Sequence, residues 1–308
     1  MAKYEEMIKV LVTGGTGQLG MELKNSEKNP KFNFYFPSSD ECDLRDIETI
    51  KKCLDQDDYN LVLNLAAYTN VDAAETDQES AKLVNQKGVG LLAQETFERN
   101  LGLIHASTDY VFGGKDSGPY NYDSIKSPLN YYGLSKSNGE DEVLNKNKNC
   151  LIIRFSSLFS EYGNNFVKTM MRTIINNKDV NVVSDQMITM SYAGDFSNNI
   201  EYLIELFNEN KNIKILHFAN KDYATWFSVA KVIYEEIEML LDKDIKCNLN
   251  PISSSDWTSK AVRPLDSRLN VNFDLLKENE IYLKSWKERV RLVVKKVLPS
   301  ILNGKNYE

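Results

Sequence analysis

Short apolar runs alternate with helical patterns along the first half of the chain. Runs that are apolar on both faces predict buried strands at residues 7–13, 32–37, 61–67, 101–107 and 150–159, with one more at 213–218. Helical periodicity predicts a short helix after Gly20 and others over 47–54, over 80–99 and from about Tyr131. Such alternation indicates a parallel sheet covered by helices on both faces. Ligands of such a sheet lie beyond the carboxyl ends of its strands.

The pattern is less regular after about residue 160. Helices are predicted over 166–175, 196–207 and 226–241, and the serine-rich segment 250–264 is expected to be a loop. The basic stretch 284–296 carries Trp286, Val290 and further valines at helical spacing. This spacing favours an amphipathic helix with a solvated basic face over a nucleic-acid site. Because we see neither an internal repeat nor a long linker, the second half should pack directly on the first.

The composition is that of a globular protein. The 308 residues include 37 basic and 44 acidic side chains, which give a net charge of -7, and the mean hydropathy is -0.42. A nucleic-acid partner requires a basic face, and a membrane helix requires about 20 apolar residues in succession. We therefore expect neither a nucleic-acid nor a membrane partner. The polar N-terminus does not resemble an export signal, so we expect a cytoplasmic protein.

Cysteines and histidines offer no metal site or disulfide framework in the sequence. The four cysteines lie far apart, and the two histidines, His105 and His217, each lie within an apolar run. We expect both histidines to be buried core or strand-edge residues. A three-histidine zinc site is impossible, and a Ser-His-Asp hydrolase would have to use one of these two histidines.

Three glycines after the first predicted strand have the spacing of a phosphate-binding turn. Residues 13–20 read TGGTGQLG, with Gly14, Gly17 and Gly20 in the pattern G-x-x-G-x-x-G. The first glycine allows a sharp turn, the second allows a pyrophosphate to approach, and the third allows the helix to press on the sheet. Free N–H groups at the helix start then face the phosphates. The turn predicts a dinucleotide site in a Rossmann-type, doubly wound parallel sheet.

The end of the second predicted strand bears on which dinucleotide binds. An acidic side chain there would bind the ribose 2′-hydroxyl and favour NAD. The strand ends instead at Pro37, Ser38 and Ser39, with no arginine close behind. Because the two hydroxyls could accept a 2′-phosphate, we favour NADPH over NADH.

Tyr132 and Lys136 are four residues apart at the start of a predicted helix and should share one face. An ammonium beside a phenol favours the phenolate, so we expect the pKa of Tyr132 to fall from about 10 towards neutrality. Tyr122 and Lys126 have the same spacing, but they precede Pro128 in a stretch where a loop is expected. We therefore select Tyr132 and Lys136.

Thr108 follows the strand predicted at 101–107 and should lie at the carboxyl edge of the sheet. Its hydroxyl could bind the substrate oxygen that Tyr132 protonates. Two hydroxyls and an ammonium around a carbonyl, beside a nicotinamide, describe a ketone reductase that needs no metal.

These residues resemble the extended short-chain dehydrogenase/reductase family and, within it, the dTDP-4-dehydrorhamnose reductases. The resemblance covers most of the chain. It is carried by TGGTGQLG (13–20), NLAAYTNVDAAE (64–75), STDYVF (107–112), SPLNYYGLSKSNGE (127–140), GNNFVKTM (163–170), VVSDQ (182–186) and VRPLDSRL (262–269).

The resemblance implies reduction of the 4-keto group of a dTDP-6-deoxy-hexulose by hydride from NADPH or NADH, in dTDP-L-rhamnose synthesis. It assigns catalysis to Thr108, Tyr132 and Lys136. Tyr132 and Lys136 would also contact the cofactor, together with Gly14, Gly17, Gln18, Leu19, Gly20, Ser38, Ser39, Asp43, Leu44, Ala66, Ala67, Tyr68 and Asn85. The dTDP-sugar substrate would contact Tyr110, Asn165 and Arg263, whose planar fork suits a diphosphate.

The implied architecture has two parts, and a homodimer is considered. Residues 1–160 plus about 181–219 would form the NAD(P)-binding Rossmann domain, and about 161–180 plus 220–308 a smaller α/β sugar-nucleotide-binding region.

Two departures from the family pattern affect the expected sugar pocket. Ser157 stands where the family usually has a tryptophan, and residues 187–191 replace a Gly-x-Pro-Thr segment. Both leave the hydride machinery intact, so a reductase or epimerase for a different nucleotide sugar stays open. A dehydratase is disfavoured because no glutamate follows Asp109. A cofactor-binding regulatory subunit without turnover is a further alternative, although it predicts loss of the Tyr132–Lys136 pair.

Overall fold

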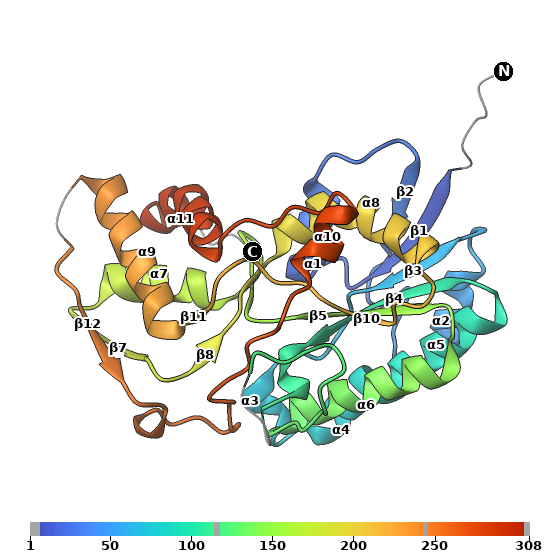
Figure 1. The fold of residues 1–308 in the computed structure, drawn as a ribbon, viewed down its shortest axis with the longest axis horizontal. Coiled ribbons are helices and arrows are strands. Elements are labelled where there is room, and N and C mark those ends of the chain that lie inside the picture. The colour runs from blue at the N-terminus through green and yellow to red at the C-terminus, as the bar shows by residue number, and fades with distance from the viewer. Residues whose placement is uncertain (1–6, 114–117, 243–244, 305–308) are drawn as a thin grey trace.

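A six-stranded parallel sheet forms the centre of the larger part of the molecule (Figure 1). The structure is a computed structural model and describes residues 7–113, 118–242 and 245–304. The sheet has the order β10-β5-β4-β3-β1-β2. Its strands are β1 (Ile8–Thr13), β2 (Phe32–Tyr35), β3 (Leu61–Asn64), β4 (Gly102–Thr108), β5 (Cys150–Phe155) and β10 (Ile215–His217). The strand order reverses between β1 and β3, and in an open α/β sheet this switch point places a ligand crevice beyond the carboxyl ends of those two strands.

Helices cover both faces of the sheet, because residues of one strand face opposite sides in turn. Val10 and Val12 belong to a core on the face covered by α1 (Gln18–Asn25) and α8 (Ala193–Glu209). Leu11 belongs to a second core, on the face covered by α2 (Ile47–Leu54), α5 (Val89–Glu98) and α6 (Tyr131–Lys146). The predicted Rossmann-type α/β fold is confirmed.

The helix predicted over 80–99 is interrupted. It consists of α4 (Gln78–Lys82), a π-helical turn at Leu83–Gly88 and then α5. The turn carries Asn85, which is fully buried. Single π turns inside helices are frequent at functional sites, where they re-aim a side chain.

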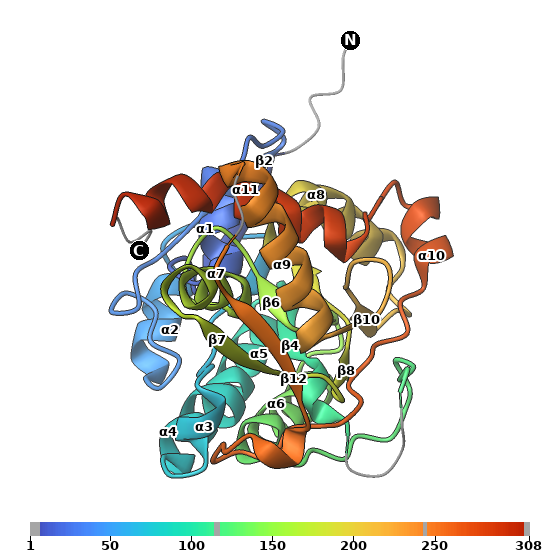
Figure 2. The ribbon, with the colours of Figure 1, turned by 90° about the vertical axis from the view of Figure 1, so that its left-hand side faces the viewer.

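A smaller α/β part packs beside the sheet and has its own core. It contains α7 (Phe166–Asn176), β7 (Asp179–Val183), α9 (Trp226–Leu241), β12 (Asn248–Ile252) and α11 (Trp286–Leu302). Figure 2 shows the β7–β12 pair in front of this part. The predicted division of the chain stays a prediction. Within 181–219, β7 packs with α7 and α9, whereas α8 and β10 pack with the large sheet.

Two sequence-based expectations are wrong. The segment 250–264 is not all loop, because residues up to Ile252 belong to β12, which pairs in parallel with β7. The run 150–159 is not one strand, because Ser157 adopts a left-handed φ of 45° and divides β5 from β6 (Leu158–Phe159). The remaining short elements are α3 (Val71–Ala74), β8 (Met187–Ile188), β9 (Ser191–Tyr192), β11 (Ala224–Thr225) and α10 (Phe273–Glu278), with 3-10 turns at Asp109–Val111 and Ser254–Asp256.

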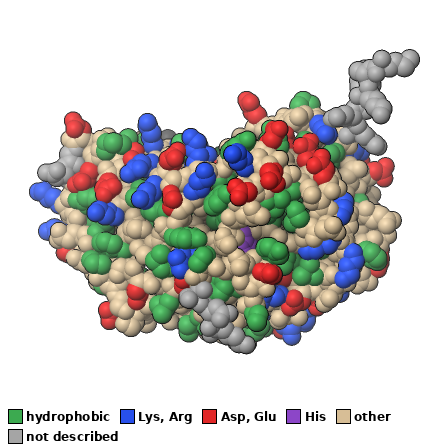
Figure 3. Space-filling view, in the orientation of Figure 1, with side chains coloured by type: hydrophobic (Ala, Val, Ile, Leu, Met, Phe, Trp, Pro, Cys, Tyr) green, Lys and Arg blue, Asp and Glu red, His purple; other side chains and the backbone are tan. Residues whose placement is uncertain are grey.

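The basic stretch 284–296 lies mainly in α11, and Lys and Arg side chains gather over this part of the surface (Figure 3). Lys287, Arg291 and Lys295 are exposed, while Trp286 and Val290 are buried. The predicted amphipathic helix is therefore confirmed. Among the helices in the described part of the chain, none has the length and apolar character needed to cross a membrane.

Candidate active site

The glycine turn lies at the switch point and is tightly fitted. Gly14 has a φ of +74°, and a Cβ built on it would lie 2.5 Å from the backbone nitrogen of Ala66. A Cβ on Gly20 would lie 2.5 Å from the carbonyl oxygen of Gly14. Only glycine suits either position, because a side chain would strike backbone atoms. At Gly14 these atoms belong to the chain that follows β3, and at Gly20 they belong to the turn itself. The first turn of α1 then presents its N–H groups at the crevice.

A cavity of about 210 Å³ lies beside this turn. Of the residues predicted to bind the cofactor, it is lined by Gly14, Ser38, Ser39, Asp43, Leu44, Ala66 and Ala67. Arg45 also lines it and forms an ion pair with Asp43, with 2.6 Å between Nη2 and Oδ2. The sequence offered no arginine close behind Ser38 and Ser39, but the fold brings this one to the same cavity.

Two other predicted cofactor residues form a clamp. The Asn85 side chain accepts a hydrogen bond from the Tyr68 backbone nitrogen and donates one to the Tyr68 carbonyl, at 2.9 and 3.0 Å. Its amide also donates to the Ser135 hydroxyl of α6. Asn85 therefore holds the chain that follows Ala67 against the helix that carries the catalytic candidates.

Gln18, Leu19 and Asn165 have structural partners. Leu19 is buried in the core beneath the sheet. Asn165 caps α7 and donates to the side-chain oxygen of Gln18 at 2.9 Å and to the Ser160 carbonyl at 2.8 Å. Asn165 thus ties the glycine turn to the smaller part of the molecule, and its predicted contact with the substrate stays a prediction.

Tyr132 lies in the first turn of α6, where Asn130 caps the helix by accepting a hydrogen bond from the Gly133 backbone. The helix starts here because Pro128 disfavours helix just before it. The phenol of Tyr132 lies near the Thr108 hydroxyl at the end of β4, and this neighbour acts to lower the pKa of the phenol. Tyr122, by contrast, lies outside any helix and is 59% exposed.

The phenol stays protonated at neutral pH. Burial raises the pKa of Tyr132 to about 12, and the Thr108 hydroxyl opposes this only in part. The sequence-based expectation of a lowered pKa is wrong here, because desolvation of the phenolate outweighs any stabilisation from its neighbours. A protonated phenol is the form that can donate a proton.

Lys136 is fully buried on the same helix, and its ammonium donates to the carbonyl oxygen of Ala106 in β4 at 2.7 Å. Burial lowers the pKa of Lys136 to about 8, while the nearby Glu140 acts in the opposite direction. Glu140 is itself buried and held by Arg154, with 2.8 Å between its Oε2 and the arginine Nη2.

Thr108 is oriented by its neighbour Asp109. The Thr108 hydroxyl donates to Asp109 Oδ1 at 3.1 Å, and the Ser156 hydroxyl donates to Asp109 Oδ2 at 2.8 Å. Burial raises the pKa of Asp109 to about 6, with hydrogen bonds from Ser267 and Ser156 opposing it. At neutral pH this carboxylate can accept from the threonine and so fix the direction of its hydroxyl.

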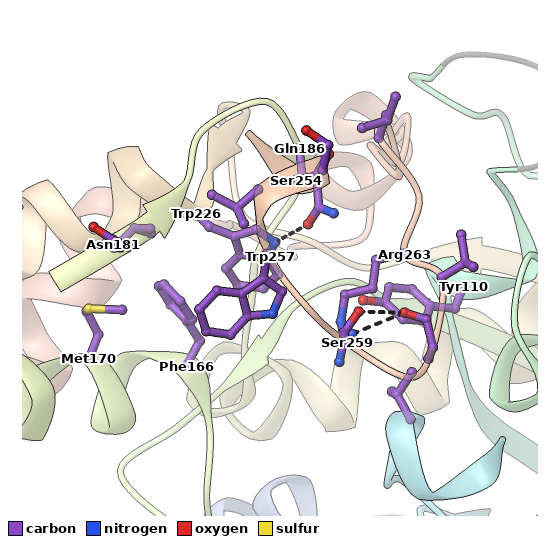
Figure 4. A pocket seen from close by; sticks show the side chains of 17 residues that line it. Tyr110, Phe166, Met170, Asn181, Gln186, Trp226, Ser254, Trp257, Ser259 and Arg263 are labelled. Carbon is purple, nitrogen blue, oxygen red and sulfur yellow. Dashed lines mark hydrogen bonds between the residues drawn. The ribbon is translucent and has the colours of Figure 1, made fainter. Parts of the chain in front are cut away.

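A larger cavity of about 680 Å³ opens next to this site, between the two parts of the molecule. Tyr110 forms part of its wall, and the Tyr110 ring lies edge-on to the Tyr132 ring with 6.0 Å between centroids. In Figure 4 the rings of Phe166, Trp226 and Trp257 lie on one side of the cavity and Arg263 and Tyr110 on the other. The cavity therefore joins an aromatic wall to a cationic one.

Arg263 forms an ion pair within the protein. Its Nη2 lies 2.7 Å from Oδ2 of Asp72 in α3, and its Nη1 donates to the carbonyl oxygen of Ala261 at 3.3 Å. The backbone nitrogen of Ala261 donates to the same carboxylate at 3.0 Å. Arg263 lies in a loop, and Asp72 holds this loop against α3, the helix that follows β3.

The family described as the RmlD substrate binding domain matches residues 8–298. The chain belongs to this family.

Several proteins match this chain over 84% of its length or more. A dTDP-4-dehydrorhamnose reductase of Aggregatibacter actinomycetemcomitans is 35% identical over 268 residues, which are 86% of this chain and 91% of that protein. A probable dTDP-4,6-dihydroxy-2-methyloxan-3-one 4-ketoreductase of Streptomyces antibioticus is 33% identical over 84% of this chain and 85% of that protein. The crystal structure of dTDP-4-dehydrorhamnose reductase from Bacillus anthracis in complex with NADP has a TM-score of 0.82 at 28% identity, over 96% of this chain and 99% of that one.

Sequence reasoning missed four residues of the site in this RmlD-family chain. The fold alone brings the charge of Arg45 to the smaller cavity, and it pairs Asp72 with Arg263 at the wall of the larger one. Trp226 and Trp257 provide aromatic walls from segments 31 residues apart. A signal existed for Trp257 alone, as a large aromatic side chain in a serine-rich segment. Among the described residues, no cluster of three or more His, Cys, Asp or Glu side chains could hold a metal.

Proposed function

We propose that this chain reduces the 4-keto group of a dTDP-6-deoxy-hexulose with hydride from NADPH, as in dTDP-L-rhamnose synthesis. The observation that carries the proposal is the position of the Thr108–Tyr132 pair. It lies at the carboxyl end of β4, next to the switch point on one side and to a cavity of about 680 Å³ on the other. Membership of the RmlD family and the names of its relatives support the same reaction.

The residues present fit a dinucleotide. The glycine turn keeps its shape because a Cβ at Gly14 or Gly20 would strike backbone atoms, and polar side chains line the cavity beside it. Backbone N–H groups at the start of α1 would hold the pyrophosphate. Ser38, Ser39 and Arg45 would hold a 2′-phosphate, which favours NADPH over NADH. When bound, NADPH supplies the hydride.

This chain's own groups supply and direct the proton. Tyr132 is protonated at neutral pH and would donate to the keto oxygen. The Thr108 hydroxyl, which donates to Asp109 in this structure, would turn its proton to the same keto oxygen and hold that oxygen in position. The Lys136 ammonium would stabilise the negative charge left on Tyr132, since a buried cation interacts strongly with a nearby anion.

The larger cavity has the walls expected for a nucleotide sugar. Its aromatic side, with Trp226 and Trp257, suits a planar base. Arg263, held in place by Asp72, would bind phosphate oxygens through its planar fork. The sugar would then extend past Tyr110 towards Tyr132.

A second candidate is the reduction of a different dTDP-sugar ketone. The Streptomyces antibioticus relative carries the name of such a ketoreductase. Ser157 also stands where the family usually has a tryptophan, which changes the expected sugar pocket. Both candidates use the same proton donor and the same cofactor, and they differ only in the sugar.

Turnover tests this proposal directly. We expect the protein to oxidise NADPH in the presence of dTDP-4-keto-6-deoxyhexulose, and Tyr132→Phe to lower kcat by at least about 100-fold with folding retained. The exposed Tyr122 has the same spacing to a lysine, so Tyr122→Phe is the matched control and should retain activity. Full activity of Tyr132→Phe, or tight NADPH binding without turnover on any dTDP-keto-sugar, would overturn the proposal.

Light scattering would test the proposed homodimer. The proposed cytoplasmic location follows from a reaction that uses NADPH and a nucleotide sugar.

A further inference from the structure

A chain of buried polar side chains connects the glycine turn to Lys136. The Thr13 hydroxyl donates to Asn64 Oδ1 at 2.6 Å, Asn64 Nδ2 lies 2.9 Å from His105 Nδ1, and His105 Nε2 lies 3.4 Å from Lys136 Nζ. All four residues are at most 2% exposed. Buried polar groups of this kind act as a unit, because none can exchange its partner for water.

The direction of the Asn64 amide is fixed by the backbone. Asn64 Oδ1 accepts a hydrogen bond from the Ala66 backbone nitrogen at 3.2 Å as well as from Thr13. A backbone N–H can only donate, so the oxygen must face it and the NH₂ group must face His105. His105 Nδ1 therefore accepts a hydrogen bond from Asn64, and in a neutral ring the proton then lies on Nε2.

His105 is neutral, because burial and the neighbouring Lys136 hold its pKa well below the ordinary value. Its Nε2–H consequently points at Lys136 Nζ. When Lys136 is an ammonium, two donors face each other across 3.4 Å. When it is an amine, its lone pair can accept from Nε2–H while the Ala106 carbonyl accepts from the amine.

We propose that His105 is a positioning residue that acts through Lys136 and sets the upper pH limit of the reaction. Asn64 fixes His105 as the Nε2–H tautomer, and this tautomer disfavours the ammonium form of Lys136. The proposal rests on the mechanistic role of Lys136 given above. Glu140 also acts on Lys136: it favours the ammonium and is neutralised in part by Arg154. Tyr132 lies one turn earlier on α6.

His105→Gln is the first test, because its amide can turn an oxygen towards Lys136 and so favour the ammonium. We expect the fall of kcat at high pH to move upward by about one pH unit, a tenfold change in the lysine's proton affinity. His217→Gln is the matched control. His217 is the second buried histidine and also faces a cation, with 3.4 Å from its Nε2 to Arg154 Nη1, but it does not contact Lys136. Its pH profile should equal that of the unmodified protein.

Asn64→Asp provides an independent second variant. A carboxylate at this position accepts from Nδ1–H, which moves the ring proton to Nδ1 and leaves Nε2 to accept from the ammonium. The high-pH fall should again move upward. Thermal unfolding of each variant establishes that it is folded at the assay temperature. The proposal would be overturned if the pH at which kcat falls stayed the same or moved downward in a folded His105→Gln or Asn64→Asp variant.

The pH dependence of NADPH binding gives a readout that does not require turnover. If the protein binds NADPH but reduces no keto-sugar, the proposed function fails, while titration of Lys136 still appears in the binding curve. The role of His105 fails separately if His105→Gln and His217→Gln give the same pH dependence of NADPH affinity.

Discussion

Arg263 and Asp72 form an ion pair with 2.7 Å between Nη2 and Oδ2, although 191 residues separate them in the chain. The pair joins the loop after β12 to the helix after β3 and lies at the wall of the larger cavity. An arginine that already has one carboxylate partner keeps its orientation before a phosphate arrives, so less side-chain entropy is lost on binding.

Arg263→Gln should therefore raise KM for the dTDP-sugar by about 10- to 100-fold with a smaller effect on kcat, because charge-assisted hydrogen bonds contribute about 1.5–3 kcal/mol each. Arg268 forms a similar ion pair with Asp266 but does not line the cavity. Arg268→Gln is thus the control and should leave KM near its original value. Equal KM values for the two variants would show that Arg263 does not contact the substrate.

Trp257→Ala should weaken binding of dTDP by roughly tenfold, since stacking a base on an aromatic ring contributes about 1–3 kcal/mol. The side chain is 53% exposed at the cavity wall, so its removal should leave folding intact. Isothermal titration with dTDP measures the change, and Trp257→Phe should recover part of the affinity. Unaltered affinity in the alanine variant would place the base elsewhere.

Arg45→Ala should raise KM for NADPH by about tenfold and leave KM for NADH nearly unchanged, because only NADPH carries the 2′-phosphate. Lys51, a partly exposed cation paired with Glu48 on α2, serves as a control for loss of one positive charge. A parallel rise in KM for both cofactors would mean that Arg45 does not recognise the 2′-phosphate.

Glu22 should make the protein less stable as the pH rises. Burial raises the pKa of Glu22 to about 8, with its hydrogen bond to Glu161 as the next cause. The Glu161 carboxylate, held by Lys296, has a lowered pKa. Between about pH 4.5 and pH 8 the folded protein keeps a proton on Glu22 that the unfolded chain has lost, so the free energy of unfolding decreases over this window.

Glu22→Gln removes this titration. We expect the variant to be more stable than the unmodified protein at pH 8.5 by about 1 kcal/mol, or roughly 2–4 °C in Tm, and to show a flatter dependence between pH 5 and 8. Glu288→Gln, which changes an exposed glutamate paired with Lys284, controls for loss of one charge. Parallel stability curves for the two proteins would contradict the raised pKa.

Local patterns predicted the elements that hold the site. The bounds of α2 and α9 are those predicted from the helical spacing of apolar residues. This spacing depends only on residues that are close together in the sequence. The prediction of one strand over 150–159 was wrong at Ser157. The left-handed backbone of this residue cannot be recognised from its mostly apolar neighbours in the sequence. The prediction of a loop at β12 was wrong for another reason. Pro251 and its polar neighbours are typical of a loop, and the segment becomes a strand only because it pairs with β7.

The sequence by itself determined the order of strands and helices, the glycine turn and the placement of Tyr132 and Lys136 on one helix face, since each follows from spacing along the chain. Tertiary structure alone decided which charges meet and how strongly each is desolvated. It brought Arg45 to Ser38, Asp72 to Arg263 and His105 to Lys136, and by burial it raised the pKa of Tyr132 where spacing had predicted a fall. Proton affinity depends on the surrounding dielectric and on partners distant in sequence, and neither is encoded in local spacing.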